Sequence, residues 1–245
     1  MSTNLAVQAD FGLHVRDHLA YVEDHNAATL DEIADRAFVT VTGGHRIHVS
    51  GSGHSMAAVL EAFFRAGGLA CVNAVVHPAL MPLEGGGEST LTERTSGFAA
   101  LLVTRAAPTP DDLAVIVSHS GVNAYPVEYA EEMHRHGTPV IAIMSLPHSS
   151  QMEARVGRKL GDIADWVLDT RVPYGDATYP AGDAVTAGIS SMVNVYLWDL
   201  LLVRLADRAN AGSVQLPIWT SANVAGGDER NRDLLHTYRR LIPLL

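Results

Sequence analysis

LAVIVSHSGVN, residues 113–123, joins five consecutive apolar residues to a turn rich in hydroxyl groups. An unbroken apolar run of this length predicts a strand buried on both faces, as in a parallel sheet covered by helices. The turn is suited to holding a phosphate. Serine hydroxyls donate hydrogen bonds, glycine lets the backbone approach, and the free N–H groups of a following helix face the anion.

An earlier stretch, IHVSGSGHS at residues 47–55, repeats this plan. It too joins a short apolar strand to Ser and Gly residues and then to a helix pattern. Two such turns predict one anionic ligand held from two sides. The candidate binding residues are Ser52, Gly53, Ser55, Ser118, Ser120, Gly121 and Asn123.

Strand and helix patterns alternate along the chain. Strands are expected at about 46–50, 70–76, 113–117, 140–144 and 166–169. Helices are expected at about 11–42 (two helices or one bent helix), 55–66, 89–104, 126–136 and 187–206, with a loop at 171–183. This alternation predicts an α/β fold in three layers, with helices on both faces of a parallel sheet. Ligands of such sheets bind beyond the carboxyl ends of the strands, where both turns lie.

Composition limits the class of protein. The 245 residues suffice for one full core, so we expect a single domain, 1–245, with an N-terminal helical segment (about 8–43) and a C-terminal tail (about 212–245). A net charge of −10 argues against a nucleic-acid surface. Cys71 is the only cysteine, so no internal disulfide is expected. Neither a signal peptide nor a membrane span is recognisable, and we expect a cytoplasmic protein.

The paired turns resemble those of the SIS (sugar isomerase) domain, a flavodoxin-like fold that binds phosphosugars. The second turn of that family commonly has the pattern Ser-x-Ser-Gly-x-Thr, which Ser118, Ser120 and Gly121 match while Asn123 replaces the threonine. The first turn matches at Gly53 and Ser55. The C-terminal segment 221–231 is similar to that of an uncharacterised SIS-domain family described as phosphosugar isomerases. The resemblance spans essentially the whole chain.

Several residues are candidates for the chemistry. The resemblance implies that Glu61 occupies the position of a glutamate common in SIS isomerases, and Glu93 is the second candidate base. His54 and His119 lie in the two turns and could move protons near neutral pH. Asp176, in the loop after the last strand, is a candidate for ligand contact. No metal site is expected, because only His14 and His18 have ligand spacing, and that pair lies on a polar helix face with no glycine-rich site nearby.

Three hypotheses for function remain open. The first is an aldose–ketose phosphosugar isomerase in which a carboxylate moves a proton between C1 and C2 and a histidine assists ring opening, without cofactor or metal. The second is an etherase that removes lactate from N-acetylmuramate 6-phosphate. The third is a phosphosugar sensor without catalysis. The expected ligand is a phosphorylated sugar or amino sugar, and the apolar helix at 187–206 predicts a homodimer or higher homo-oligomer.

Overall fold

Five parallel strands form the central sheet of the computed structural model, which describes residues 3–245 and the side chains of 11–245. The strands are β1 (Ile47–Gly51), β2 (Val72–Ala74), β3 (Leu113–Val117), β4 (Val140–Met144) and β5 (Trp166–Asp169). Their spatial order is β2-β1-β3-β4-β5, with every neighbouring pair parallel. The predicted α/β parallel sheet is confirmed, and β3, β4 and β5 have the bounds expected from the apolar runs.

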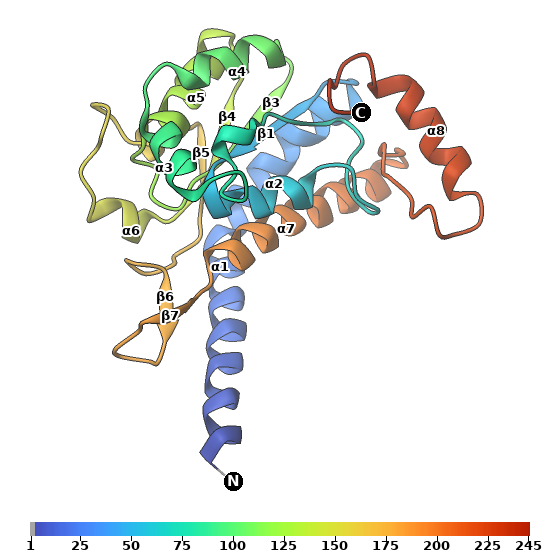
Figure 1. Cartoon of the computed structure of the whole chain (residues 1–245). Helices are drawn as coiled ribbons and strands as arrows, with labels where there is room; N and C mark the ends of the chain where they lie inside the picture. The colour runs from blue at the N-terminus through green and yellow to red at the C-terminus, as the bar shows by residue number, and fades with distance from the viewer. Residues whose placement is uncertain (1–2) are drawn as a thin grey trace.

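Alternate residues of each strand enter two different cores, as the period of two in a strand requires. In β3, Leu113, Val115 and Val117 pack on one face, whereas Ala114 and Ile116 pack on the other. The first face is covered by α1 (Thr3–Thr42), α2 (Met56–Ala62) and α7 (Ser190–Gly212). The second is covered by α4 (Phe98–Ala106) and α5 (Ala124–Arg135), with α3 (Gly86–Arg94) beside α5. These are the three expected layers (Figure 1).

The N-terminal segment is one continuous helix of 40 residues. Residues 13–42 contain neither Gly nor Pro, so nothing in this stretch breaks the helix. Its N-terminal end extends beyond the rest of the molecule, and the remainder packs mainly on α7 and β5 (Figure 1). The alternative of two separate helices is therefore wrong.

The helix expected at 89–104 is two helices. The extended residue Thr95 ends α3, and Gly97, the N-cap of α4, has the left-handed φ of +87°. The Gly97 N–H donates to Glu128 Oε2 at 2.7 Å. The expected loop at 171–183 also contains structure. It holds β6 (Ala177–Tyr179), which forms a two-stranded antiparallel sheet with β7 (Thr186–Gly188).

The C-terminal segment packs on its own chain. It includes α8 (Gly227–Tyr238), and Trp219, Tyr238 and Ile242 are buried in the core that also contains α1 and α7. The N–H of Ala70 donates to the carbonyl of Pro217 at 2.7 Å, which ties this segment to the residues before β2. Trp219, Tyr238 and Ile242 thus find their burial within the chain, whereas Val224, Leu241 and Leu244 remain exposed.

Three short helical turns and one short helix complete the described part of the chain. They are η1 (Gly53–Ser55), η2 (Pro78–Leu80), η3 (Leu160–Asp162) and α6 (Leu146–Ser150). Across the described residues, every helix is too short or too polar to cross a bilayer.

Candidate functional site

The two serine-rich turns begin side by side. Gly51 at the end of β1 pairs with Val117 at the end of β3, so Ser52 and Ser118 leave adjacent strands at the same level. Neighbouring strands lie roughly 4.8 Å apart. The structure therefore brings together the two segments that the sequence predicted to share one ligand, at the carboxyl edge of the sheet.

The first turn passes through η1 into α2. Gly53 has φ of +57°, and a Cβ built there would meet no atom within 4 Å, so glycine is needed for its backbone conformation and faces open space. The Ser52 and Ser55 hydroxyls make no helix-capping hydrogen bond. His54 is exposed at the tip. Within the described residues the two serine hydroxyls of this turn make no hydrogen bond, whereas the carbonyls of Ser52, Gly53 and His54 all accept one.

The second turn is closed by Ser118, whose Oγ accepts the N–H of Gly121 at 3.2 Å. Gly121 has φ of +64°, which disfavours any side chain, and a Cβ there would lie 2.6 Å from Met144 Cε and 3.1 Å from Leu160 Cβ, so a larger residue would have to displace both neighbours. Ser118 is buried and holds the turn, whereas the hydroxyl of Ser120 is half-buried and makes no side-chain hydrogen bond within the described residues. Ser120 is thus the freer of the two serines for a ligand.

The N-terminus of α5 faces the same edge of the sheet. Asn123 is its N-cap residue but makes no capping hydrogen bond, and helix geometry leaves the N–H groups of Ala124 and Tyr125 without intrahelical acceptors. These groups, with the positive end of the helix dipole, favour an anion. The Asn123 amide also remains available to donate.

Two buried tyrosines fix the position of this helix. The Tyr125 hydroxyl lies 2.6 Å from Ser50 Oγ, and Ser50 donates to the carbonyl of Val75 at 2.7 Å, so Tyr125 is the donor to Ser50. Tyr129 donates to the carbonyl of His48 at 3.3 Å. Burial raises the pKa of Tyr125 well above its usual value, which keeps the donor protonated. The helix N-terminus is therefore anchored to β1.

His119 lies in the second turn with both ring nitrogens buried and without a hydrogen-bond partner. Its ring centroid is 4.2 Å from that of His148 in α6. Burial, with a smaller effect of His148, lowers the pKa of His119 to about 4, although Asp176 acts in the opposite direction. At neutral pH the ring is uncharged, so it can accept a hydrogen bond but is poorly suited to supply a proton.

Asp176 has a structural partner. Its Oδ1 accepts the N–H groups of Ile189 at 3.0 Å and Ser190 at 2.9 Å, and its Oδ2 accepts the Ser190 hydroxyl at 2.7 Å. The carboxylate thus caps the start of α7. This engagement argues against the ligand contact predicted for Asp176.

The two candidate bases differ in their surroundings. Glu61 lies in the last turn of α2 and forms an ion pair with Arg65. Glu93 lies in the last turn of α3, a helix that packs beside η1, and its carboxylate makes no ion pair or side-chain hydrogen bond within the described residues. Among the described residues, neither carboxylate makes a hydrogen bond or ion pair with the two turns, so their catalytic roles stay predictions.

The sequence did not single out His148 or Tyr174, whose ring lies beside that of His148. Both follow strand ends, His148 after β4 and Tyr174 after β5, at the same edge as the two turns. The rule that ligands bind at this edge would have flagged them. Among the described residues, no group of three His, Cys, Asp or Glu side chains is arranged to hold a metal.

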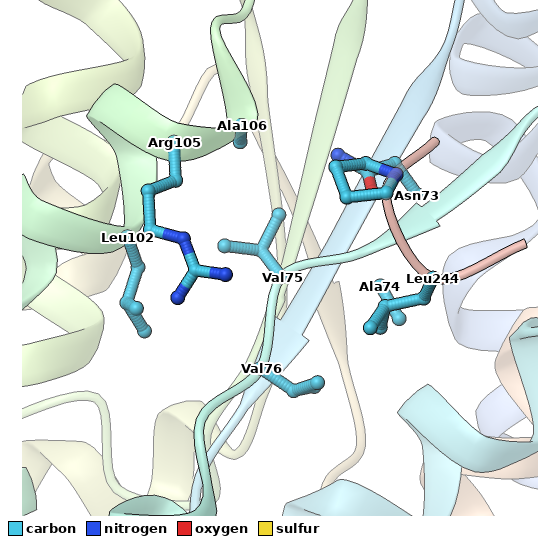
Figure 2. A pocket seen from close by; sticks show the side chains of 9 residues that line it. Asn73, Ala74, Val75, Val76, Leu102, Arg105, Ala106 and Leu244 are labelled. Carbon is cyan, nitrogen blue, oxygen red and sulfur yellow. The ribbon is translucent and has the colours of Figure 1, made fainter. Parts of the chain in front are cut away.

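A separate pocket lies beside β2, the strand at one edge of the sheet (Figure 2). Its walls come from β2, α4 and the C-terminal segment, and the side chain of Arg105 extends into it beside Leu102 and Val75. None of the predicted site residues lines this pocket. It is therefore distinct from the two turns.

The fold is a doubly wound α/β sheet whose phosphate-type turns meet at its carboxyl edge, and comparison with known proteins gives the family. The profile of the SIS domain matches residues 10–145. A UPF0309 protein from Caldanaerobacter subterraneus subsp. tengcongensis is 32% identical over 238 residues, covering 93% of this chain and 97% of the relative. One from Brucella canis is 34% identical over 229 residues, covering 93% and 94%. The chain belongs to the SIS-domain family and, within it, to the UPF0309 proteins.

Known structures share the fold. Phosphoheptose isomerase GmhA from Neisseria gonorrhoeae superposes with a TM-score of 0.55 at 20% identity, covering 84% of this chain and 100% of that one. The sugar isomerase domain of the RpiR transcription factor from Sphaerobacter thermophilus superposes with a TM-score of 0.50 at 16% identity, covering 98% and 100%. The predicted SIS fold is therefore confirmed.

Proposed function

We propose that this protein binds a phosphorylated sugar or amino sugar at the paired turns and interconverts its aldose and ketose forms. The pairing of Gly51 with Val117 carries this proposal, because it brings two phosphate-type turns to one place. The similarity in fold to phosphoheptose isomerases supports it.

The residues at the carboxyl edge of the sheet would have separate roles in binding the sugar phosphate. The Ser120 hydroxyl, the Asn123 amide and the α5 N-terminus would hold the phosphate, and Gly53 would let the first turn approach from the other side. A fixed phosphate would hold the sugar carbons in a defined orientation relative to the base, which lowers the entropy cost of the proton transfer.

The chemistry needs one carboxylate. In the forward direction a base removes the proton from C2 of the open-chain aldose, giving an enediolate, and returns a proton to C1 while the O2 hydroxyl proton passes to O1, which gives the ketose. We assign this role to Glu93, because its carboxylate is uncommitted and α3 packs beside η1. His119, neutral at pH 7 with both ring nitrogens buried, would support the second turn rather than donate a proton.

Incubation with a panel of sugar phosphates in deuterium oxide tests this proposal. The panel includes fructose 6-phosphate, glucosamine 6-phosphate and N-acetylmuramate 6-phosphate, and products are followed by proton nuclear magnetic resonance. Isomerisation predicts deuterium incorporation at C1 or C2 together with the other isomer. Release of lactate would identify an etherase instead.

A sensor is the second candidate. The RpiR sugar isomerase domain, which belongs to a transcription factor, aligns with 98% of this chain, and neither candidate carboxylate makes a hydrogen bond or ion pair with the two turns among the described residues. A sensor predicts a raised melting temperature with a sugar phosphate but no deuterium incorporation after prolonged incubation. Cytoplasmic location and homodimeric assembly, both expected from the sequence, stay predictions.

A further inference from the structure

Three aromatic rings from three different loops form a column at the carboxyl edge. It begins with His119 in the second turn and continues with His148, 4.2 Å away between ring centroids. It ends with Tyr174, which stacks on His148 at 5.0 Å with 21° between ring planes. Tyr174 is 55% exposed, so one of the largest apolar side chains at this edge lies open to solvent.

The backbone around Tyr174 is held in place. The N–H of Asp176 donates to the carbonyl of Pro173 at 3.1 Å, closing a turn over Tyr174. The N–H of Gly175 donates to His148 Nδ1 at 3.2 Å. The Asp176 carboxylate caps α7, which fixes the far side of the turn. An exposed aromatic ring on a rigid turn is already ordered before a ligand arrives, so binding costs little further entropy.

The same contacts determine which ring nitrogen of His148 carries the proton. Because His148 Nδ1 accepts the Gly175 N–H, the neutral ring carries its proton on Nε2. Burial lowers the pKa of His148, which favours this neutral form. Tyr174 is thus backed by a neutral ring rather than by a cation that would draw its electrons away from a ligand.

We infer that Tyr174 is the platform on which the carbon skeleton of the sugar phosphate packs. This inference rests on the proposed function and adds the residue that recognises the sugar rather than the phosphate. Sugars carry C–H groups on the faces of their carbon chain and hydroxyls at the edges. An aromatic face excludes water from the C–H groups and attracts them weakly through its electron density, while the hydroxyls stay free to hydrogen-bond. The two turns bind the charged phosphate, and one ring, that of His148, separates Tyr174 from His119 in the second turn.

Four versions of the protein test this role: wild type, Tyr174→Phe, Tyr174→Leu and Tyr174→Ala. Each is titrated calorimetrically with fructose 6-phosphate, glucosamine 6-phosphate and inorganic phosphate. The platform predicts that Phe binds both sugar phosphates within about twofold of wild type, whereas Leu and Ala bind them about tenfold more weakly, as expected for loss of an aromatic contact. The affinity for inorganic phosphate should be unchanged in all four. Leu101→Ala, which removes an exposed apolar side chain from α4, controls for general surface effects.

Two results would overturn the inference while leaving the proposed function intact. One is binding of both sugar phosphates by Tyr174→Ala with wild-type affinity. The other is a parallel loss of inorganic phosphate, which would mean that Tyr174 only supports the turns. If wild type binds inorganic phosphate but neither these nor any other sugar phosphate of the panel, the proposed function itself fails, and the platform fails with it.

Discussion

Gly51 and Val117 occupy the last paired positions of β1 and β3. This pairing sets the level at which the backbone leaves the sheet after β1 and after β3. The two serine turns therefore begin side by side on adjacent strands. A shift of one residue in either strand would reverse the faces on which its side chains lie and separate the turns. The register of two central strands therefore determines whether a shared anion site exists.

Gly121→Ala should damage the second turn. The new Cβ would lie 2.6 Å from Met144 Cε and would also occupy a left-handed conformation with φ of +64°. Gly157→Ala is a matched control, because its φ is +76° but no atom lies within 4 Å of the new Cβ. We expect Gly121→Ala to cost about 1–3 kcal/mol more than the control in urea unfolding. Equal losses would show that Met144 moves aside freely.

Glu93→Gln should abolish turnover with little effect on sugar phosphate affinity, because the amide keeps the shape but cannot take the proton. We expect a loss of about a hundredfold or more in kcat. Glu61→Gln, which removes only the partner of Arg65, should change kcat by less than about threefold. The reverse pattern in steady-state kinetics would transfer the role of base to Glu61.

His119 should make the protein less stable in acid. Its pKa is lowered to about 4 in the folded state, whereas an unfolded histidine titrates near 6.5. Between these values the unfolded chain binds a proton that the folded chain does not, so the free energy of unfolding falls as pH drops from about 6.5 to 4. Urea unfolding across this window should give a smaller fall for His119→Gln than for wild type.

His136→Gln, at an exposed position, is the control for that series and should keep the wild-type slope. Identical slopes for wild type and His119→Gln would contradict the assignment of a neutral buried ring.

Asp112 is a buried structural carboxylate at the opposite edge of the sheet. It accepts from the Arg46 N–H at 2.7 Å, the Arg46 guanidinium at 2.9 Å and the Thr109 N–H at 2.9 Å, and lies 3.2 Å from His48 Nε2. Although burial acts in the opposite direction, these partners hold its pKa well below the usual range. Asp112→Ala removes the acceptor of His48 Nε2 and, among the described residues, the only carboxylate beside the Arg46 guanidinium, which keeps backbone carbonyls as acceptors, and we expect a loss of about 3–5 kcal/mol.

The neighbouring residue supplies the comparison for that measurement. The side chain of Asp111 is 72% exposed, so Asp111→Ala should change the free energy of unfolding by less than about 0.5 kcal/mol. Similar losses in the free energy of unfolding for Asp111→Ala and Asp112→Ala would show that the buried contacts of Asp112 do not stabilise the fold.

Much of the fold follows from local patterns. The apolar runs at 113–117, 140–144 and 166–169 predict strands with their observed bounds, because strands buried on both faces are nearly continuous apolar runs; Asp169, at the end of the last run, is the polar exception. Gly97 is a local signal for the break between α3 and α4. The apolar pattern continues across this glycine, so the sequence predicts one helix there. The helical conformation of residues 227–238 was missed, since they are polar and their few apolar contacts come from distant segments.

The site is predictable only in part. Each turn has a local composition that identifies it, whereas the column of His119, His148 and Tyr174 depends on three loops meeting in space. Asp176 shows the opposite case. Its position in a Gly-rich loop suggests a ligand contact, but the partner that occupies it, the start of α7, lies thirteen residues further on and is visible only in three dimensions.

A titration with fructose 6-phosphate, followed by the chemical shifts of backbone amides, tests the central claim most directly. If the paired turns bind the phosphate, the largest shifts will fall on Gly53, Ser120, Gly121 and Ala124. Arg105 and Val76, which line the pocket beside β2, will be unaffected. Shifts concentrated at Arg105 and Val76, with none in the two turns, would contradict the account.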